Sequence, residues 1–400
     1  MNKLKLLISV HKRKKMKLSN LARNMGASAI RAMYNEALNM TDTISFTVGE
    51  PDFVTPRIII DEAVEAWQRG LTHYTPNAGI QELRKAIAEY HKDDLNPNYQ
   101  NEILVSCGAM ESLQLALLTL VDPGDEVILV TPAWANYFGH IAMSGAVMKE
   151  VRVTEETEFI PTVDQMRKAI TPKTKLVMIN SPCNPTGAVI DSETSKGLAE
   201  LFVEHDLFVI SDEIYNRLVY DGLKYTSITS FPGMRERTVY ISGFSKMFAM
   251  TGWRLGYSIA RPDIIQAMTK LHENSASCLP EPTQLAGARA LKSCQSDVDR
   301  MRDIYEKRRN LIFDLVNDMP GVKVTKPKGA FYLFVNIKDT GMKSSEFCMD
   351  LLRKTGVVTV PGTGFGDAGE GYIRLTYATS DENIIEGMGR MKQYLVNRMS

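Results

Sequence analysis

The sequence lacks the features that mark several classes of protein. Five cysteines are scattered over 400 residues without a Cys-x-x-Cys pair, which argues against a disulfide framework and against a zinc site. The six histidines are dispersed, and no His-Glu-x-x-His motif occurs. We therefore expect a protein of a reducing compartment, the cytoplasm, that binds no metal.

An excess of one charge and a long apolar run are also missing. Lys+Arg and Asp+Glu both number 47, so the zero net charge gives no reason to expect nucleic acid or an anionic membrane as partner. No run approaches the roughly 18 apolar residues of a membrane span. Residues 1–17 are basic, but their apolar stretch is too short for a signal-peptide core, and we expect a flexible tail. The predicted partners are small molecules.

What is present points to a large folded core. Hydrophobic residues make up 44% and charged residues 24%, which is typical of a globular protein. A chain of 400 residues is long enough for one large α/β domain with a smaller partner.

A repeating strand–helix pattern runs through the middle of the chain. Apolar, strand-like runs are predicted at residues 103–106, 126–130, 176–179, 207–210 and 239–241. Continuous apolar strands separated by helices indicate an α/β fold with a largely parallel sheet covered on both faces. Each run ends in a polar or glycine-bearing segment, and ligands bind at such carboxyl ends in open α/β sheets.

The pattern changes after about residue 290. The expected elements are helices over residues 296–318, 345–354 and 381–397, and strands at residues 330–335, 357–360 and 372–376. They form an α+β unit, which we expect the helix-like segment 18–40 to join. The sequence thus predicts a large cofactor-binding domain over residues 46–292 and a small domain made of residues 18–45 with 293–400.

A lysine follows one of the predicted strand ends. Ser242-Gly243-Phe244-Ser245-Lys246 comes directly after the run 238–241, and Arg254 lies eight residues further on. Hydroxyl groups and a glycine at a strand end form a cradle for an anion. Desolvation and a neighbouring cation would leave Lys246 as a nucleophilic amine. An amine beside a phosphate site is what pyridoxal phosphate requires, as Schiff-base partner and anchor.

Other strand ends carry the remaining groups that this cofactor needs. Asp212 is placed to hold the proton on the pyridine nitrogen, and Tyr215 and Asn184 can donate to the ring oxygen. Trp134 could stack on the ring. The phosphate cradle is predicted from backbone N–H groups at a helix start, hydroxyls and one fixed cation: Gly108, Ala109, Met110, Ser242, Ser245 and Arg254.

With these motifs the chain resembles the class I aminotransferases of the fold-type I pyridoxal-phosphate enzymes. The resemblance covers residues 18–398. It rests on Ser-Pro-Cys-Asn184-Pro-Thr-Gly, Ser-Asp212-Glu-Ile-Tyr215, the segment from Ser242 to Arg254, and Tyr-Ile-Arg374-Leu-Thr-Tyr-Ala. The segments Thr-Val-Gly49-Glu-Pro-Asp and His-Tyr74-Thr-Pro-Asn-Ala-Gly are similar to the prokaryote-type aspartate and aromatic aminotransferases.

The resemblance implies a seven-stranded, mostly parallel sheet and a ping-pong transfer of the amino group from an L-amino acid to a 2-oxo acid such as 2-oxoglutarate. It implies that Arg374, Asn184 and Gly49 bind the substrate and that Lys246, Asp212 and Tyr215 carry the catalysis. It further implies a homodimer with shared active sites, in which Tyr74 reaches the phosphate bound by the neighbouring subunit.

One position departs from the family pattern. Some aspartate-specific members have a lysine in the phosphate-loop segment that grips the side-chain carboxylate, and here the corresponding residue is Met110. Aspartate, aromatic and broad donor ranges therefore stay open.

Two other functions are compatible with the same scaffold. The first is a β-lyase acting on sulfur amino acids, or a decarboxylase-like relative, which product analysis would separate from a transaminase. The second is a non-enzymatic aminotransferase-like domain of a transcription regulator. It would need a DNA-binding module, and the tail at residues 1–17 is too short to be one.

Overall fold

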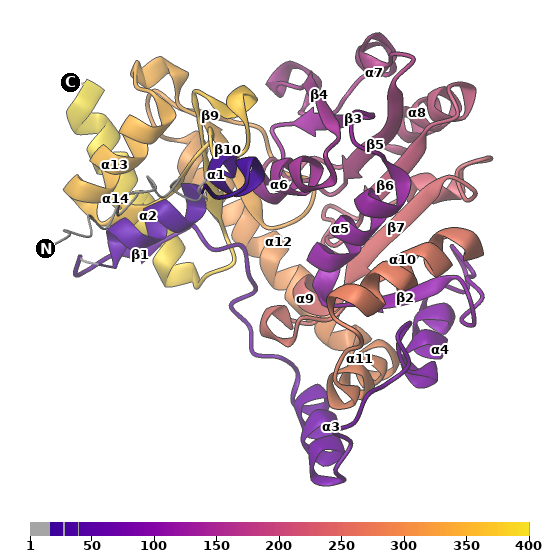
Figure 1. Ribbon diagram of the computed structural model, residues 1–400. Helices are drawn as coiled ribbons and strands as arrows, with labels where there is room; N and C mark the ends of the chain where they lie inside the picture. Colours follow the sequence, from indigo (N-terminus) through magenta and orange to yellow (C-terminus); the bar gives the residue numbers. More distant parts are fainter. Residues whose placement is uncertain (1–16, 27–28, 39, 400) are drawn as a thin grey trace, which may run out of the picture.

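A seven-stranded sheet forms the centre of the larger of two units in the computed structural model, which describes residues 17–26, 29–38 and 40–399 (Figure 1). In spatial order its strands are β2 (Ile103–Ser106), β8 (Gly256–Ile259), β7 (Thr238–Gly243), β6 (Phe208–Asp212), β5 (Thr174–Asn180), β3 (Glu126–Thr131) and β4 (Val147–Arg152). Strand β8 runs antiparallel to both of its neighbours, and the pairings from β7 to β4 are parallel. The expectation of a mostly parallel seven-stranded sheet is confirmed.

Helices cover both faces of this sheet, as the alternation of buried side chains along β5 requires. Leu176 and Met178 face one hydrophobic core, and Val177 and Ile179 face another. The first core is covered by α5 (Gly108–Leu120), α6 (Ala135–Ser144) and α10 (Pro262–Ser275). The opposite face carries α4 (Gln81–Tyr90), α7 (Val163–Ala169), α8 (Ser192–Glu204) and α11 (Glu281–Ser293), with α3 (Arg57–Gln68) packed on α11.

The second unit is built on a smaller, antiparallel sheet. Its strands lie in the order β12 (Val360–Pro361), β13 (Tyr372–Thr376), β10 (Tyr332–Asn336) and β9 (Lys323–Val324). A separate parallel pair joins β1 (Ile44–Ser45) to β11 (Val357–Val358). The surrounding helices are α2 (Ala29–Ala37), α12 (Gln295–Asn317), α13 (Ser344–Thr355) and α14 (Asp381–Met399). The segment around residue 44 therefore meets the C-terminal segment as expected, while the proposed domain boundaries stay a prediction.

The structure differs from the sequence expectations at several elements. The helix expected over residues 18–40 is two helices, α1 (Asn20–Asn24) and α2, and the strand expected at 357–360 is divided at Thr359 between two sheets. Strands β4, β8 and β9 had not been predicted. Lys246 lies in the short helix α9 (Phe244–Met247) directly after β7.

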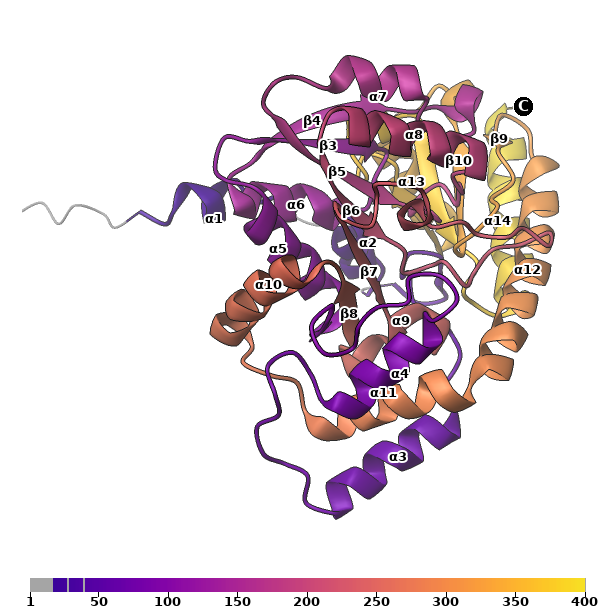
Figure 2. The ribbon, with the colours of Figure 1, turned by 90° about the vertical axis from the view of Figure 1, so that its right-hand side faces the viewer.

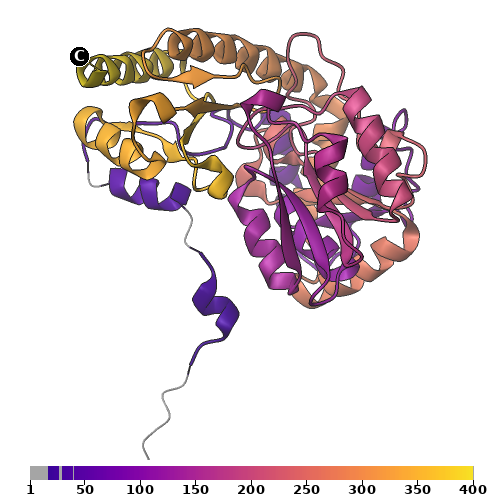
Figure 3. The same cartoon turned by 90° about the horizontal axis from the view of Figure 1, so that it is seen from above.

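Helix α1 extends away from the rest of the described chain. It projects beyond both units in Figures 2 and 3, and the Met25 sulfur that follows it comes close to Gly139 of α6. The basic tail expected at residues 1–17 lies outside the described residues, apart from Lys17. Within the described part of the chain, no helix has both the length and the apolar character to cross a membrane.

Two neighbouring arginines on α12 hold loops of both units in place. Arg308 donates to both oxygens of Asp52 at 2.9 Å and to Asp381 at 3.0 Å. Arg309 is fully buried and donates to both oxygens of Asp221 at 2.7 and 2.8 Å and to the carbonyl of Pro327 at 3.0 Å. A buried guanidinium is stable only with such partners. The ion pair between Arg309 and Asp221 therefore holds the loop at residue 221 in place.

We expect Asp221→Ala to lower the free energy of unfolding by about 1–3 kcal/mol, because it leaves the Arg309 guanidinium buried with fewer partners. Arg309 also holds the pKa of Asp221 below its usual range. The stabilisation is therefore present above the pKa of an unfolded aspartate, and it disappears as the pH falls through the lower pKa of the folded state. Thermal melting from pH 3 to 7 measures this difference.

Asp61→Ala is the matched control, because Asp61 forms an exposed pair with Arg57 one helical turn away. Such pairs contribute at most about 0.5 kcal/mol. Equal melting temperatures for the two variants at pH 7 would show that Asp221 does not stabilise the buried arginine.

Candidate active site

A cavity of about 200 Å³ lies where the carboxyl ends of the large sheet meet the second unit. Most residues predicted from the sequence line it together: Gly49, Ala109, Met110, Trp134, Asn184, Asp212, Tyr215, Ser245, Lys246, Arg254 and Arg374. They come from the loops after β1, β3 and β5, from the start of α5, from the carboxyl ends of β6 and β7 with the segments that follow them, and from β13. The convergence of strand ends that the sequence indicated is therefore present in the structure.

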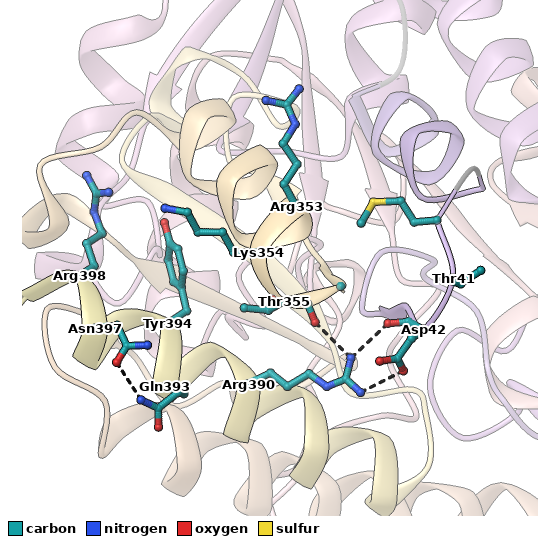
Figure 4. A pocket seen from close by; sticks show the side chains of 12 residues that line it. Thr41, Asp42, Arg353, Lys354, Thr355, Arg390, Gln393, Tyr394, Asn397 and Arg398 are labelled. Atoms are coloured by element: carbon teal, nitrogen blue, oxygen red, sulfur yellow. Dashed lines mark hydrogen bonds and ion pairs between the residues drawn. The ribbon is translucent and has the colours of Figure 1, made fainter.

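A larger hollow lies elsewhere, between residues 40–42 and the ends of α13 and α14 (Figure 4). Its volume is about 810 Å³, and Arg390 crosses it to donate to Asp42 and to the carbonyl of Thr355. None of the residues predicted to carry chemistry lines this hollow. We identify the candidate site by the chemistry of its side chains rather than by the size of the hollow.

Lys246 presents its amine at the centre of the cavity. Its Nζ donates to the carbonyl of Gly49 at 2.5 Å, and it lies 5.9 Å from the ring centroid of Tyr215 and 5.8 Å from that of Phe331. Burial lowers the pKa of Lys246 to about 8, helped by the positive charges of Arg374 and Arg254. Near pH 7 the amine is still mostly protonated, but its neutral, nucleophilic fraction is much larger than that of an ordinary lysine.

Asp212 is the last residue of β6 and is buried. One of its oxygens accepts a hydrogen bond from the Tyr137 hydroxyl at 2.7 Å, and the other accepts from the Ile214 N–H at 3.2 Å. Burial raises the pKa of Asp212 to about 6, although both hydrogen bonds act in the opposite direction. A positively charged group in the cavity would favour the ionised carboxylate again.

Arg374 lies on β13 with its guanidinium buried between aromatic rings. Its Cζ is 4.5 Å from the ring centroid of Tyr332 and 4.9 Å from that of Phe365. One nitrogen donates to Asn184 Oδ1 at 3.1 Å, another donates to the carbonyl of Thr47, and Nε has no partner. Among the described residues no carboxylate pairs with Arg374, so this buried cation can take an anion from the cavity.

A second anion-binding region lies at the start of α5. Gly108 begins this helix with a positive φ of 73°, and a Cβ there would come within 2.5 Å of the Arg254 guanidinium. Arg254 therefore packs directly against the helix start, whose first N–H groups have no partners within the helix. Ala109 and Ser245 line the cavity at this end. Helix dipole, N–H groups and a cation together favour a phosphate.

Three residues predicted for the site do not line the cavity: Gly108, which begins α5, Ser242 and Tyr74. Ser242 is fully buried within β7, opposite Tyr257 of β8, and its hydroxyl does not line the cavity. Side chains alternate along a strand, and Ser245 is the serine that reaches the site. Tyr74 is 91% exposed and also does not line the cavity of its own chain.

The structure adds residues that sequence reasoning missed. The Tyr137 hydroxyl of α6 donates a hydrogen bond to Asp212. The side chain of Asn180, at the end of β5, accepts a hydrogen bond from the backbone N–H of Asn184 at 2.9 Å. Tyr332 of β10 lines the cavity. Two signals in the sequence could have indicated Tyr137 and Asn180: Tyr137 lies three residues after Trp134, and Asn180 is the polar last residue of β5. Nothing in the sequence around Tyr332 indicated a site.

The side chains that line the cavity have the chemistry that pyridoxal phosphate requires. The cavity combines a partly neutral lysine, a buried carboxylate and, at the start of α5, a region suited to a phosphate, and these are the groups the cofactor requires. Within the described residues no group of three or more His, Cys, Asp or Glu side chains could hold a metal ion.

Comparison with known proteins identifies relatives along nearly the whole chain. Residues 41–390 match the family described as "Aminotransferase class I and II". The chain is 44% identical to an aspartate aminotransferase of Pyrococcus abyssi and 42% identical to an aromatic-amino-acid aminotransferase of Thermococcus litoralis, each covering 95% of this chain and 98% of the relative. It is also similar to the solved structure of the Thermus thermophilus aspartate aminotransferase with maleate, with a TM-score of 0.90, 36% identity, and coverage of 95% of this chain and 100% of that one.

The depressed pKa of Lys246 predicts a pH-dependent effect on stability. In protein prepared without cofactor, Lys246→Met should raise the melting temperature at pH 7, because the wild-type chain keeps a buried amine charged at a cost on the order of 3 kcal/mol at most. The gain should be full below pH 8 and should disappear between pH 8 and 10.5, where the unfolded lysine loses its proton as well.

Lys196→Met is the control for this measurement, since Lys196 is 67% exposed on α8. It should change the melting temperature little at any pH. A Lys246→Met protein that is no more stable than wild type at pH 7, or whose gain does not vary with pH, would contradict the lowered pKa.

Proposed function

Since the chain belongs to the class I and II aminotransferase family, it is a pyridoxal-phosphate-dependent transaminase, and we propose that its preferred donor is an L-amino acid with a neutral, especially an aromatic, side chain. The observation that carries the assignment of residues is the buried Arg374, which has no carboxylate partner among the described residues and shares a cavity with Lys246 and Asp212.

We propose the following roles for the residues of this chain. Arg374 binds the α-carboxylate of the substrate through its planar guanidinium. Asn184 accepts a hydrogen bond from this guanidinium and so fixes its orientation. Lys246 takes the proton from the substrate Cα and returns one as general base and acid, for which a pKa of about 8 is suitable. The bound cofactor supplies the electron sink that makes this Cα proton acidic.

Asp212 and Tyr137 belong to the part of the cavity that would hold the cofactor. The Asp212 carboxylate would hold a proton on the ring nitrogen of the cofactor, and the hydrogen bond from Tyr137 keeps that carboxylate aimed into the cavity. In this proposal Tyr215 donates to the ring oxygen, Trp134 contacts the ring, and Arg254, Ser245 and the start of α5 bind the phosphate; Tyr215, Trp134, Arg254 and Ser245 all line the cavity.

The donor proposal rests on the distribution of charge around the cavity. Among its lining residues the cations are Lys246, Arg254 and Arg374, and each already has a role. Met110, Ile214 and Tyr332 are the remaining large side chains of the lining, and none of them carries a positive charge. Met110 also borders a second hollow, which is lined by three further methionines, Phe138 and the carboxylates of Glu150 and Asp367 but by no lysine or arginine. This surrounding favours an apolar side chain over a carboxylate.

We expect phenylalanine or tyrosine to exceed aspartate by about tenfold or more in kcat/KM, since a buried carboxylate without a cation costs more than one hydrogen bond. The assay should test all common L-amino acids with pyruvate and, separately, 2-oxoglutarate as acceptor. Pyruvate has no second carboxylate, so it isolates donor selectivity. Lys246→Ala protein should transfer no amino group.

Met110→Lys supplies the matched change, and it should shift the aspartate-to-phenylalanine ratio by about tenfold toward aspartate. Met143→Lys is its control, because Met143 borders only the second hollow. A wild-type preference for aspartate would overturn the donor proposal and place the required cation outside this chain's cavity. Release of pyruvate and thiol from sulfur amino acids would indicate a lyase instead.

We further propose a cytoplasmic homodimer whose active sites are shared. Support comes from one stretch of the surface, residues 54–74, where large apolar side chains are exposed: Val54, Ile58, Val64, Trp67 and Tyr74. An exposed apolar patch of this kind marks an interaction surface. In a two-fold dimer the Tyr74 hydroxyl would serve the phosphate of the neighbouring subunit.

Mixed dimers test this arrangement. A Lys246→Ala chain supplies an intact Tyr74, and a Tyr74→Phe chain supplies an intact lysine, so one of the two sites in a mixed dimer is wholly native. Co-refolding the two variants should therefore give tight cofactor binding and full activity in about a quarter of all sites. Values equal to the average of the two separate variants would mean that Tyr74 does not act across an interface.

A further inference from the structure

Tyr332 contacts three parts of the active site at once. It is the first residue of β10, 1% exposed, and no motif of the sequence singled it out. Its hydroxyl lies 2.8 Å from the Tyr215 hydroxyl, and the face of its ring lies 4.5 Å from the Arg374 guanidinium carbon. Tyr332 thus contacts both Arg374, the predicted binder of the substrate carboxylate, and Tyr215, the predicted hydrogen-bond donor to the cofactor.

The third contact explains why residue 49 is a glycine. A Cβ on Gly49 would lie 2.1 Å from the Tyr332 hydroxyl oxygen and 3.0 Å from its ring, although Gly49 does not have a positive φ. The glycine is therefore required by the closeness of Tyr332 rather than by backbone strain. The carbonyl of Gly49 in turn accepts the hydrogen bond from Lys246.

The two tyrosine hydroxyls form one hydrogen bond in which either oxygen can be the donor. Neither hydroxyl has another hydrogen-bond partner among the described residues. Each phenol carries one proton, so Tyr215 can donate to a group in the cavity only when Tyr332 donates to Tyr215. Burial raises the pKa of Tyr332, and the positive charge of Arg374 works against that rise. The cation therefore favours donation by Tyr332.

We propose that Tyr332 is a positioning residue that links the charge state of Arg374 to the hydrogen bond that Tyr215 donates into the cavity. While Arg374 has no anion, Tyr332 donates strongly and Tyr215 can give its own proton to the ring oxygen of the cofactor. When a substrate carboxylate neutralises Arg374, Tyr332 donates less strongly and the hydrogen bond from Tyr215 weakens. This proposal rests on the proposed roles of Arg374 and Tyr215.

Tyr332→Phe tests the link, because it removes the hydroxyl and keeps the ring that packs on Arg374. The readout is the pH midpoint of the absorbance change of the cofactor-loaded protein. Donation from Tyr215 stabilises the anionic ring oxygen, so weaker donation should move the midpoint upward by about half a unit to one unit. Tyr377→Phe is the control: this buried tyrosine donates to the backbone carbonyl of Ala330 outside the cavity. Its midpoint should match wild type, and melting temperatures report the folding of both variants.

Two further measurements separate a link from a local packing effect. In a Tyr215→Phe background, Tyr332→Phe should not move the midpoint further, because the hydroxyl that transmits its effect is absent. Saturation with 3-phenylpropanoate, which has a carboxylate but no amino group, should raise the wild-type midpoint, and this rise should be smaller in Tyr332→Phe.

A Tyr332→Phe protein with the midpoint and the carboxylate-induced shift of wild type would overturn the proposal, and so would equal effects of Tyr332→Phe with and without the Tyr215 hydroxyl. Failure of the proposed roles looks different. In that case the wild-type protein itself would show no response of the midpoint to the carboxylate.

Discussion

A positive charge buried without an opposite charge is the interaction on which this site depends. The Arg374 guanidinium is held by the Asn184 side chain, the carbonyl of Thr47 and two aromatic rings. Removing such a cation from water costs several kcal/mol, and neutral oxygens and ring faces compensate only in part. The uncompensated part favours any anion that enters the cavity in the right orientation. If Arg374 has its proposed role, affinity for the substrate carboxylate is thus built into the fold.

The same groups connect the two units of the molecule. Arg374 belongs to the small sheet, and Asn184 follows a strand of the large one. Lys246 follows β7 of the large sheet, and its partner Gly49 lies just after β1, which pairs with β11 beside the small sheet. The hydrogen bond between Arg374 and Asn184 therefore crosses from one unit to the other, and the one between Lys246 and Gly49 joins the large sheet to the segment after β1. A shift of the units against each other would change the surroundings of the lysine and the arginine together.

The large sheet and most of the cavity could be predicted because their signals are local. Apolar runs that end in Asn184, Asp212 and Lys246 place side chains at one edge of a parallel sheet, whatever the rest of the chain does. Strand β8 (Gly256–Ile259) was missed because its glycine and its antiparallel pairing do not follow the strand–helix pattern. Thr359 divides one apolar run between two sheets, a choice that long-range packing makes. Ser242 was assigned to the cavity because a motif does not show which side of β7 a residue faces.

The residues that could not be predicted are those that form hydrogen bonds to the predicted site residues from distant parts of the sequence. Tyr137 holds Asp212 from a helix 75 positions away, and Tyr332 meets Tyr215 across 117 positions. Neither contact leaves a pattern in the sequence near the catalytic residue.

Burial shifts the pKa values of Asp212 and Lys246 in opposite directions, and the positions of the charged groups around the cavity set the direction in which a ligand would bind. Burial raises the pKa of Asp212 to about 6 and lowers the pKa of Lys246 to about 8, so both groups are shifted toward their neutral forms. The cavity then offers a site for a cation beside Asp212, a site for an anion at Arg254 and the start of α5, and a second site for an anion at Arg374. A molecule with a protonated ring nitrogen at one end and a phosphate at the other satisfies the first two in one orientation only, and it leaves the third for the substrate.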